Sequence, residues 1–147
     1  GFGKLLSSRT GDDRRKTEEG IIQDMTALTG QKPVITKAKD SIAGFKIRKG
    51  MPMGAKVTLR KNRRYDFLEK FFNVVLARSR DFHGVSPDVV DQMGNMTIGV
   101  KEHIFFPEIL PEKVKNILGL EITVVSTART KEEGLELFRL IGVPFKR

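Results

Sequence analysis

The chain of 147 residues has no cysteine and no tryptophan, and it has only one tyrosine and two histidines. Without cysteine, neither a disulfide framework nor a cysteine-based zinc site can form. His83 and His103 lie twenty residues apart in the sequence with no closely spaced partner, so they do not have the spacing of zinc ligands. We interpret them as a loop residue and a strand residue, and we expect no metal and no cofactor.

Motifs of catalysis are missing as well. Gly1 and Gly3 before Lys4 lack the spacing of a phosphate-binding loop, and no G-x-S-x-G elbow occurs. The acidic pairs at 12–13 and 132–133 are typical of a loop and of a helix start, not of paired catalytic carboxylates. The longest apolar runs, such as residues 74–77, fall far short of the ~20 residues that span a bilayer. We predict that the protein is not an enzyme.

What the chain has in excess is positive charge in one stretch. Between Lys32 and Arg64, eleven residues are Lys or Arg and one, Asp40, is acidic. This stretch carries a net charge of +10, whereas the whole chain carries +9. Since 39% of the residues are hydrophobic, the chain can form a core, and its length predicts a single domain. A structured basic surface of this kind suits a polyanion, and nucleic acid is the leading candidate.

The spacing of apolar residues predicts a mixed architecture. Expected helices cover residues 17–28, 63–77 and 130–141, with a further helical turn within 112–118. Expected strands cover residues 33–38, 45–48, 55–60, 97–106 and 120–128, and the segments 1–16 and 80–95 are expected to be loops. Thr17 and Thr130 are the expected caps of the first and last helices, and Thr130 opens a capping box with Glu133. Short connections between strands indicate an antiparallel sheet with helices packed on one face, an α+β fold.

The basic stretch alternates cationic and apolar residues. We expect residues 45–48 and 55–60 to pair as strands, with Phe45, Ile47 and their apolar counterparts facing the helix that carries Phe67 and Phe71. The period of two then exposes on the opposite face Lys46, Arg48, Lys56, Thr58 and Arg60. A row of like charges across strands is destabilising, which favours a bound polyanion. A basic face that serves only solubility is the alternative.

RNA is the favoured polyanion. A flat sheet face can reach the wide minor groove and the 2′-hydroxyls of an RNA helix, whereas readers of B-DNA insert a helix into the major groove. Thr58 adds a neutral donor and acceptor between Lys56 and Arg60. A second candidate site is the connection at 49–54, in which two methionines flank Pro52. One methionine is expected to fold back on the core, and the stiffened tip could meet a second RNA surface.

A family resemblance is carried by nine short segments, at residues 30–33, 41–48, 50–54, 56–60, 80–82, 94–95, 104–109, 132–134 and 144–146. Together they resemble ribosomal protein L-five of the large subunit, in its bacterial and organellar form, over essentially the whole chain. The resemblance implies a non-catalytic component of the central protuberance that binds 5S rRNA and contacts other large-subunit rRNA. It also implies a location on the ribosome, in a bacterial cytoplasm or in the matrix or stroma of an organelle.

Carried over by motif, the resemblance assigns 5S rRNA binding to Gln31, Thr58 and Arg60, to which the basic face adds Lys46 and Lys56. It also implies that a hairpin loop approaches the peptidyl-site tRNA. That loop is made here of Arg48, Lys49, Gly50, Met51, Pro52, Met53 and Gly54. The small-subunit head protein S-thirteen is a further implied partner through an intersubunit bridge, for which the loop near Gly84 to Gly94 is the candidate.

The chain departs from the family in three places, one of which is Met51, where the family often has an aromatic or other apolar residue. It starts inside the family's Leu-Asn-x-Gly-x-Gly motif, so we expect a helix and a strand, with a 5S-contacting asparagine, upstream of Gly1. Residues 5–15 diverge from the short loop usual in the family. From the residues alone, two other classes stay open. One is an RNA-processing factor whose acids lie upstream, and the other is a generic basic module that binds RNA or an acidic protein.

Overall fold

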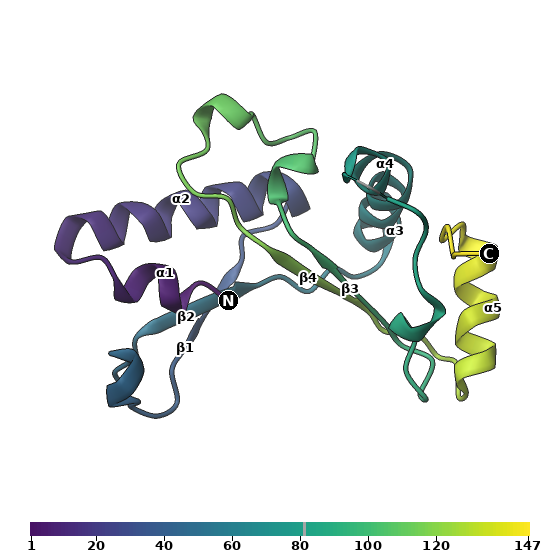
Figure 1. The fold of residues 1–147 in the computed structure, drawn as a ribbon, viewed down its shortest axis with the longest axis horizontal. Coiled ribbons are helices and arrows are strands. Elements are labelled where there is room, and N and C mark those ends of the chain that lie inside the picture. Colours follow the sequence, from purple (N-terminus) through teal and green to yellow (C-terminus); the bar gives the residue numbers. More distant parts are fainter. Residues whose placement is uncertain (81) are drawn as a thin grey trace. The chain divides into compact units, whose positions relative to one another are not determined.

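The computed structural model describes residues 1–80 and 82–147, which form two compact units, Gly1–Phe67 and Leu68–Arg147 (Figure 1). Each unit combines helices with a two-stranded antiparallel sheet. This confirms the α+β class and corrects the expectation of one sheet. Asp81, which belongs to the expected loop at 80–95 and to the quoted segment at 80–82, lies outside the described residues. The single domain over residues 1–147 stays a prediction.

Unit 1 begins with two helices, where the sequence had predicted a loop. Helix α1 is Gly3–Ser7 and helix α2 is Gly11–Thr29, so α2 starts six residues before the expected position. Thr17 is not the cap but a buried residue inside α2, and its hydroxyl donates to the Asp13 carbonyl at 2.8 Å. The acidic residues Asp12 and Asp13 lie in the first turn, where they favour the helix dipole. The helix ends at Thr29, and Gly30 follows it in the left-handed conformation with φ 71°.

The sheet of unit 1 is a hairpin of β1, Val34–Lys37, and β2, Pro52–Lys56. Thr36 lies opposite Gly54, and after a register shift Lys37 lies opposite Pro52. The ladder continues where the Ala38 amide donates to the Met51 carbonyl at 2.8 Å. The loop of this hairpin therefore runs over residues 39–49. Pro52, Met53 and Gly54 are strand residues, which corrects the predicted loop at 49–54.

The predicted pairing of residues 45–48 with 55–60 is wrong. Residues 43–45 form a 3-10 turn, η1 (Ala43–Phe45), which is closed by a bridge between Ile42 and Ile47. Lys46 adopts φ 54°, a left-handed conformation that interrupts an extended strand. Phe45 is 70% exposed and does not face the core. The alternation of apolar and cationic residues at 45–48 does not make this segment a strand, because β2 forms its backbone hydrogen bonds with β1 instead.

Helix α3, Asn62–Lys70, starts in unit 1 and ends in unit 2, where it continues as a π-helical segment, η2 (Phe71–Val75), and α4 (Leu76–Arg78). This run agrees with the helix predicted at 63–77. The other elements of unit 2 are η3 (Pro87–Val89), β3 (Met96–Val100), η4 (His103–Phe105), η5 (Pro111–Lys113), β4 (Leu120–Val124) and α5 (Lys131–Ile141). The predicted helical turn at 112–118 is the 3-10 turn η5, and the last helix is confirmed.

Strands β3 and β4 are shorter than the segments predicted at 97–106 and 120–128. They pair in register, with Ile98 opposite Ile122. The chain leaves β3 to form η4, because His103 is drawn into the interior: it is fully buried, and its Nδ1 accepts the Leu118 amide at 3.1 Å. The core of unit 2 is built on Phe71, whose ring centroid lies 6.4 Å from that of Phe106. The predicted core role of Phe71 is thus confirmed within unit 2.

Candidate nucleic-acid interface

Gln31 connects the end of α2 with the chain that follows β2. Its side-chain amide donates to the Thr58 carbonyl at 3.3 Å, and its amide oxygen accepts from the Arg63 guanidinium at 3.1 Å. Gly30, in its left-handed conformation, turns the chain out of the helix at this point. Two of the predicted site residues, Gln31 and Thr58, are therefore neighbours although 27 positions separate them.

From Lys56 at the end of β2 onward the chain presents alternating side chains, and beyond Lys56 it has no strand partner among the described residues. Lys56, Thr58 and Arg60 are exposed, whereas Val57 and Leu59 are partly buried. The alternation predicted here is therefore present, although the ladder ends at Lys56. We give the name α2–β2 surface to the half-buried Gln31 together with the exposed residues Lys56, Thr58, Arg60 and Arg63. It holds three cations and two groups that can donate and accept hydrogen bonds.

Lys46 does not belong to the α2–β2 surface. It lies in the hairpin loop, at the end of η1, with Arg48 and Lys49 close by in sequence. The predicted row of five outward residues is thus divided, since Lys46 and Arg48 come from the loop, whereas Lys56 ends β2 and Thr58 and Arg60 follow it. The like charges therefore do not face each other across paired strands.

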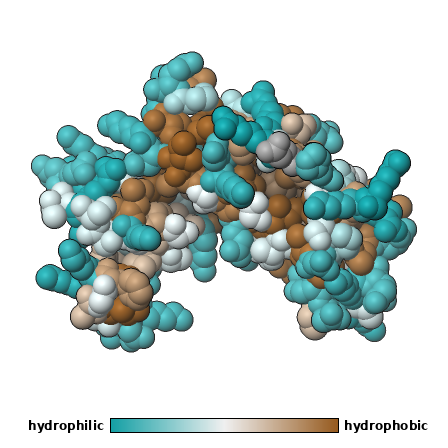
Figure 2. All heavy atoms as spheres, viewed as in Figure 1, coloured by the Kyte–Doolittle hydropathy of each residue, from teal (hydrophilic) through white to brown (hydrophobic). Residues whose placement is uncertain are grey.

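The tip of the hairpin loop combines apolar and cationic side chains. Ile42 is 47% exposed and Phe45 is 70% exposed, whereas Met51 is buried. Figure 2 shows apolar spheres at this tip with hydrophilic ones around them. One methionine folds back on the core as predicted, and it is Met51. The exposed apolar group of the tip is Phe45, which sequence reasoning had placed in the core.

The loop is tied down at its base. The Gly50 amide donates to the Ala38 carbonyl at 2.9 Å, and the Lys49 amide donates to the Ser41 hydroxyl at 2.9 Å. The guanidinium of Arg48 and the ammonium of Lys49 have no ion pair among residues 1–80 and 82–147. Such cations are available to an external anion, because no carboxylate neutralises them.

The described part of the chain lacks the features of two other kinds of site. No group of three or more His, Asp or Glu residues is gathered closely enough there to hold a metal ion. None of the described helices has the length and apolar character required to cross a membrane.

The chain is similar to known proteins over most of its length. Residues 9–48 match the family model described as Ribosomal protein L5, and residues 52–145 match the one described as ribosomal L5P family C-terminus. The chain is 51% identical over 145 residues to the large ribosomal subunit protein uL5 of Lacticaseibacillus casei, covering 97% of this chain and 81% of that protein. The uL5 protein of Halothermothrix orenii is 57% identical over 127 residues, covering 86% and 71%. The chain belongs to the ribosomal protein L5 family.

Membership of the L5 family decides several of the sequence predictions. Proteins of this family are structural components of the large ribosomal subunit, so the chain is a ribosomal protein that binds rRNA, and it is not an enzyme. The first family match ends at residue 48, inside the hairpin loop, and the second begins at residue 52, the first residue of β2. Both candidate surfaces lie in unit 1.

Sequence reasoning missed several residues of these surfaces. Arg63 had been assigned only to a helix, yet its guanidinium holds Gln31. Phe45 was treated as an apolar residue of a strand, and Ile42 was given no role of its own. The available signal was glycine: Gly44 and Gly50 flank the segment 45–49, and they argue against a regular strand there.

Proposed function

We propose that the chain binds 5S rRNA through the α2–β2 surface and meets peptidyl-site tRNA through the hairpin loop. The first part rests on the link from Gln31 to Thr58 and Arg63, which holds polar and cationic groups from three segments in one place. Residues that bind an RNA backbone and sugars need cations beside neutral donors and acceptors. The α2–β2 surface supplies both kinds of group.

The second part rests on the loop tip. Phe45 exposes an aromatic ring beside Lys46 and Arg48, and aromatic rings with neighbouring cations suit unstacked bases and their phosphates. Gly50 to Gly54 form the second half of this hairpin, including the buried Met51 that anchors it. In this proposal the chain works in a bacterial or organellar ribosome, and its contact with S-thirteen uses the loop at 84–94.

The first experiment compares 5S rRNA with an unrelated RNA duplex of equal length across a salt series. We expect a preference for 5S rRNA that persists at moderate salt. Counterion release alone would give equal binding to both RNAs, falling steeply with salt. Equal binding would therefore contradict specific recognition of 5S rRNA.

The α2–β2 surface is tested with Thr58→Ala combined with Arg60→Ala. The chain offers a matched control in Thr127→Ala with Arg129→Ala, because these two exposed residues have the same Thr-x-Arg spacing in unit 2. Loss of a base-edge contact costs about 1–3 kcal/mol, so we expect the first pair to weaken 5S binding by roughly 5- to 150-fold. The control pair removes the same charge and is expected to have a much smaller effect. Equal losses would remove this surface from the proposal.

The loop is tested with Phe45→Ser and an intact tRNA. Loss of one stacking contact costs about 1–3 kcal/mol, so tRNA affinity is expected to fall while 5S affinity is kept. A control is Val34→Ser, which removes another exposed apolar side chain of unit 1 outside the loop. Unchanged tRNA affinity in Phe45→Ser would argue against the loop as the tRNA contact.

A further inference from the structure

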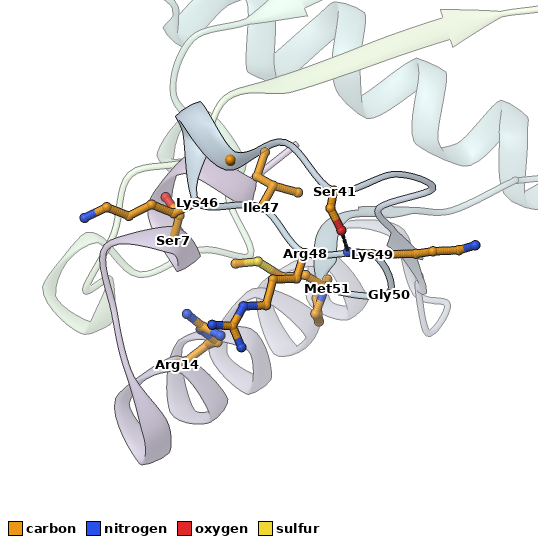
Figure 3. A pocket seen from close by; sticks show the side chains of 11 residues that line it. Ser7, Arg14, Ser41, Lys46, Ile47, Arg48, Lys49, Gly50 and Met51 are labelled. Carbon is orange, nitrogen blue, oxygen red and sulfur yellow. Dashed lines mark hydrogen bonds between the residues drawn. The ribbon is translucent and has the colours of Figure 1, made fainter.

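A pocket of about 900 Å³ lies between the hairpin loop and the first two helices of unit 1 (Figure 3). Four cationic residues line it, Arg14, Lys46, Arg48 and Lys49, together with the hydroxyl residues Ser7 and Ser41. No Asp or Glu is part of the lining. The electrostatic potential inside is therefore strongly positive, which favours an anion.

Arg14 is held in place by the protein itself. Its Nε donates to the Leu6 carbonyl at 3.2 Å, and one Nη donates to the Arg9 carbonyl at 2.8 Å. These bonds fix the guanidinium at the corner between α1 and α2, where α1 ends. A guanidinium has five N–H donors, so donors remain for a ligand after these two bonds. A group already fixed in position loses little conformational entropy when it binds.

Arg48 comes from the opposite wall of the pocket. Figure 3 shows its guanidinium and that of Arg14 pointing toward one another. Two guanidinium groups without a carboxylate in the lining repel each other, and an oxyanion between them would relieve this repulsion. The Ser41 hydroxyl accepts the Lys49 amide at 2.9 Å, and this bond fixes the rim of the pocket on the loop side.

We propose that this pocket binds one phosphate of an RNA backbone, which Arg14 and Arg48 hold together. Guanidinium groups match the geometry of phosphate oxygens through paired N–H donors. The inference rests on the proposed function, and it deepens it by adding α1 and α2 to the RNA-binding part of the chain. It also gives a role to the divergent segment 5–15, which supplies Ser7 and Arg14.

The experiment measures RNA affinity and its salt dependence for Arg14→Gln, for Arg48→Gln and for the double variant. The matched control is Arg15→Gln, which removes one charge from the adjacent, exposed position, where Arg15 pairs with Glu19 at 3.5 Å. We expect each pocket variant to lose roughly tenfold in affinity, as for a charge-assisted contact, with a smaller salt slope. If both arginines hold one phosphate, the double variant loses much less than the product of the single losses.

Thermal unfolding of each variant shows whether the fold is kept, since Arg14 also holds the end of α1. Arg48→Gln keeps the test valid if Arg14→Gln does not fold, because the Arg48 guanidinium has no hydrogen bond or ion pair among the described residues. Losses in Arg14→Gln and Arg48→Gln no larger than in Arg15→Gln would overturn the proposal. If the affinity loss of the double variant equals the product of the two single losses, the two arginines do not share one phosphate, and the proposal is likewise overturned.

Two further outcomes separate the proposals. If the wild-type chain binds 5S rRNA no better than an unrelated duplex but the pocket variants still lose affinity for both, the pocket stands as a general RNA phosphate site and the proposed function fails. Inorganic phosphate serves as a second probe of the wild-type chain and of Arg14→Gln. If it binds in the pocket while Arg14→Gln keeps full RNA affinity, the ligand is a small free anion and the RNA assignment is overturned.

Discussion

We expect replacement by alanine to change the stability of the protein in opposite directions at two glycines that lie inside helices. Gly20 lies in α2 and Gly134 in α5, and replacing glycine with alanine inside a helix gains about 1 kcal/mol in propensity. A Cβ at Gly20 would meet no atom within 4 Å. We therefore expect Gly20→Ala to stabilise the protein by about 0.5–1 kcal/mol.

At Gly134 the added Cβ would lie 2.6 Å from the Gly94 Cα and 2.8 Å from the Gly94 carbonyl oxygen. These are backbone atoms, and the turn that carries them is fixed, since the Gly94 carbonyl accepts the Ser126 hydroxyl at 2.6 Å. Either α5 or this turn must move by about 1 Å, and overpacking of this kind costs about 1–3 kcal/mol. Since the contact is to backbone, we take the upper end and expect a net loss of about 2 kcal/mol after the propensity gain.

The assay is thermal unfolding of both variants beside the wild type, followed by circular dichroism. At about 2–4 °C per kcal/mol, Gly134→Ala is expected to lower Tm by roughly 4–8 °C and Gly20→Ala to raise it by roughly 1–4 °C. Because both variants share the propensity gain, their difference reports the contact between α5 and the Gly94 turn. Equal Tm values for the two variants would refute the close packing at Gly134.

Three further predictions concern stability and binding. Phe71→Ala should cost about 3–5 kcal/mol in unfolding free energy because the ring is fully buried, whereas Phe45→Ser should change it by no more than about 0.5 kcal/mol; a large loss at position 45 would place that ring in the core. Thr130→Ala should cost about 1 kcal/mol, since the Thr130 hydroxyl accepts the Glu133 amide at 3.2 Å, and Thr130→Ser should restore it. Arg63→Gln should weaken 5S binding beyond the loss of one charge, because Arg63 positions Gln31; a loss no larger than in Arg129→Gln would contradict that role.

The helices were predicted well where a regular apolar face and local signals agreed. The helix predicted at 130–141 has a regular apolar face, and its capping threonine and Glu133 lie within one turn of each other. The observed helix α5 covers Lys131–Ile141. The Glu133 carboxylate accepts the Arg129 amide at 2.8 Å, one residue before the expected partner. The start of α2 was missed because Gly11 and the acidic pair after it suggested a loop, although acidic residues also favour a first helical turn.

The hairpin was the least predictable part. Residues 45–48 have the alternation of a strand, but a short alternation does not say which backbone will supply the hydrogen bonds. β1 pairs with β2 and leaves 39–49 as a loop, so Phe45 is exposed and Lys46 is separated from Lys56. The pocket that contains Arg14 could not be predicted either, because its two walls come from segments that are distant in sequence, with Arg14 on one and Ser41 to Pro52 on the other.

The sequence by itself determined the chemistry of this protein: a charge of +10 between Lys32 and Arg64, no cysteine, and motifs shared with the ribosomal protein L5 family. Composition and motifs are local properties, so they can be read without coordinates. Only the tertiary structure decided which cations are neighbours. Gln31 meets Thr58 and Arg14 faces Arg48 because helices and a hairpin distant in sequence pack together, and such pairings depend on long-range contacts that local patterns do not encode.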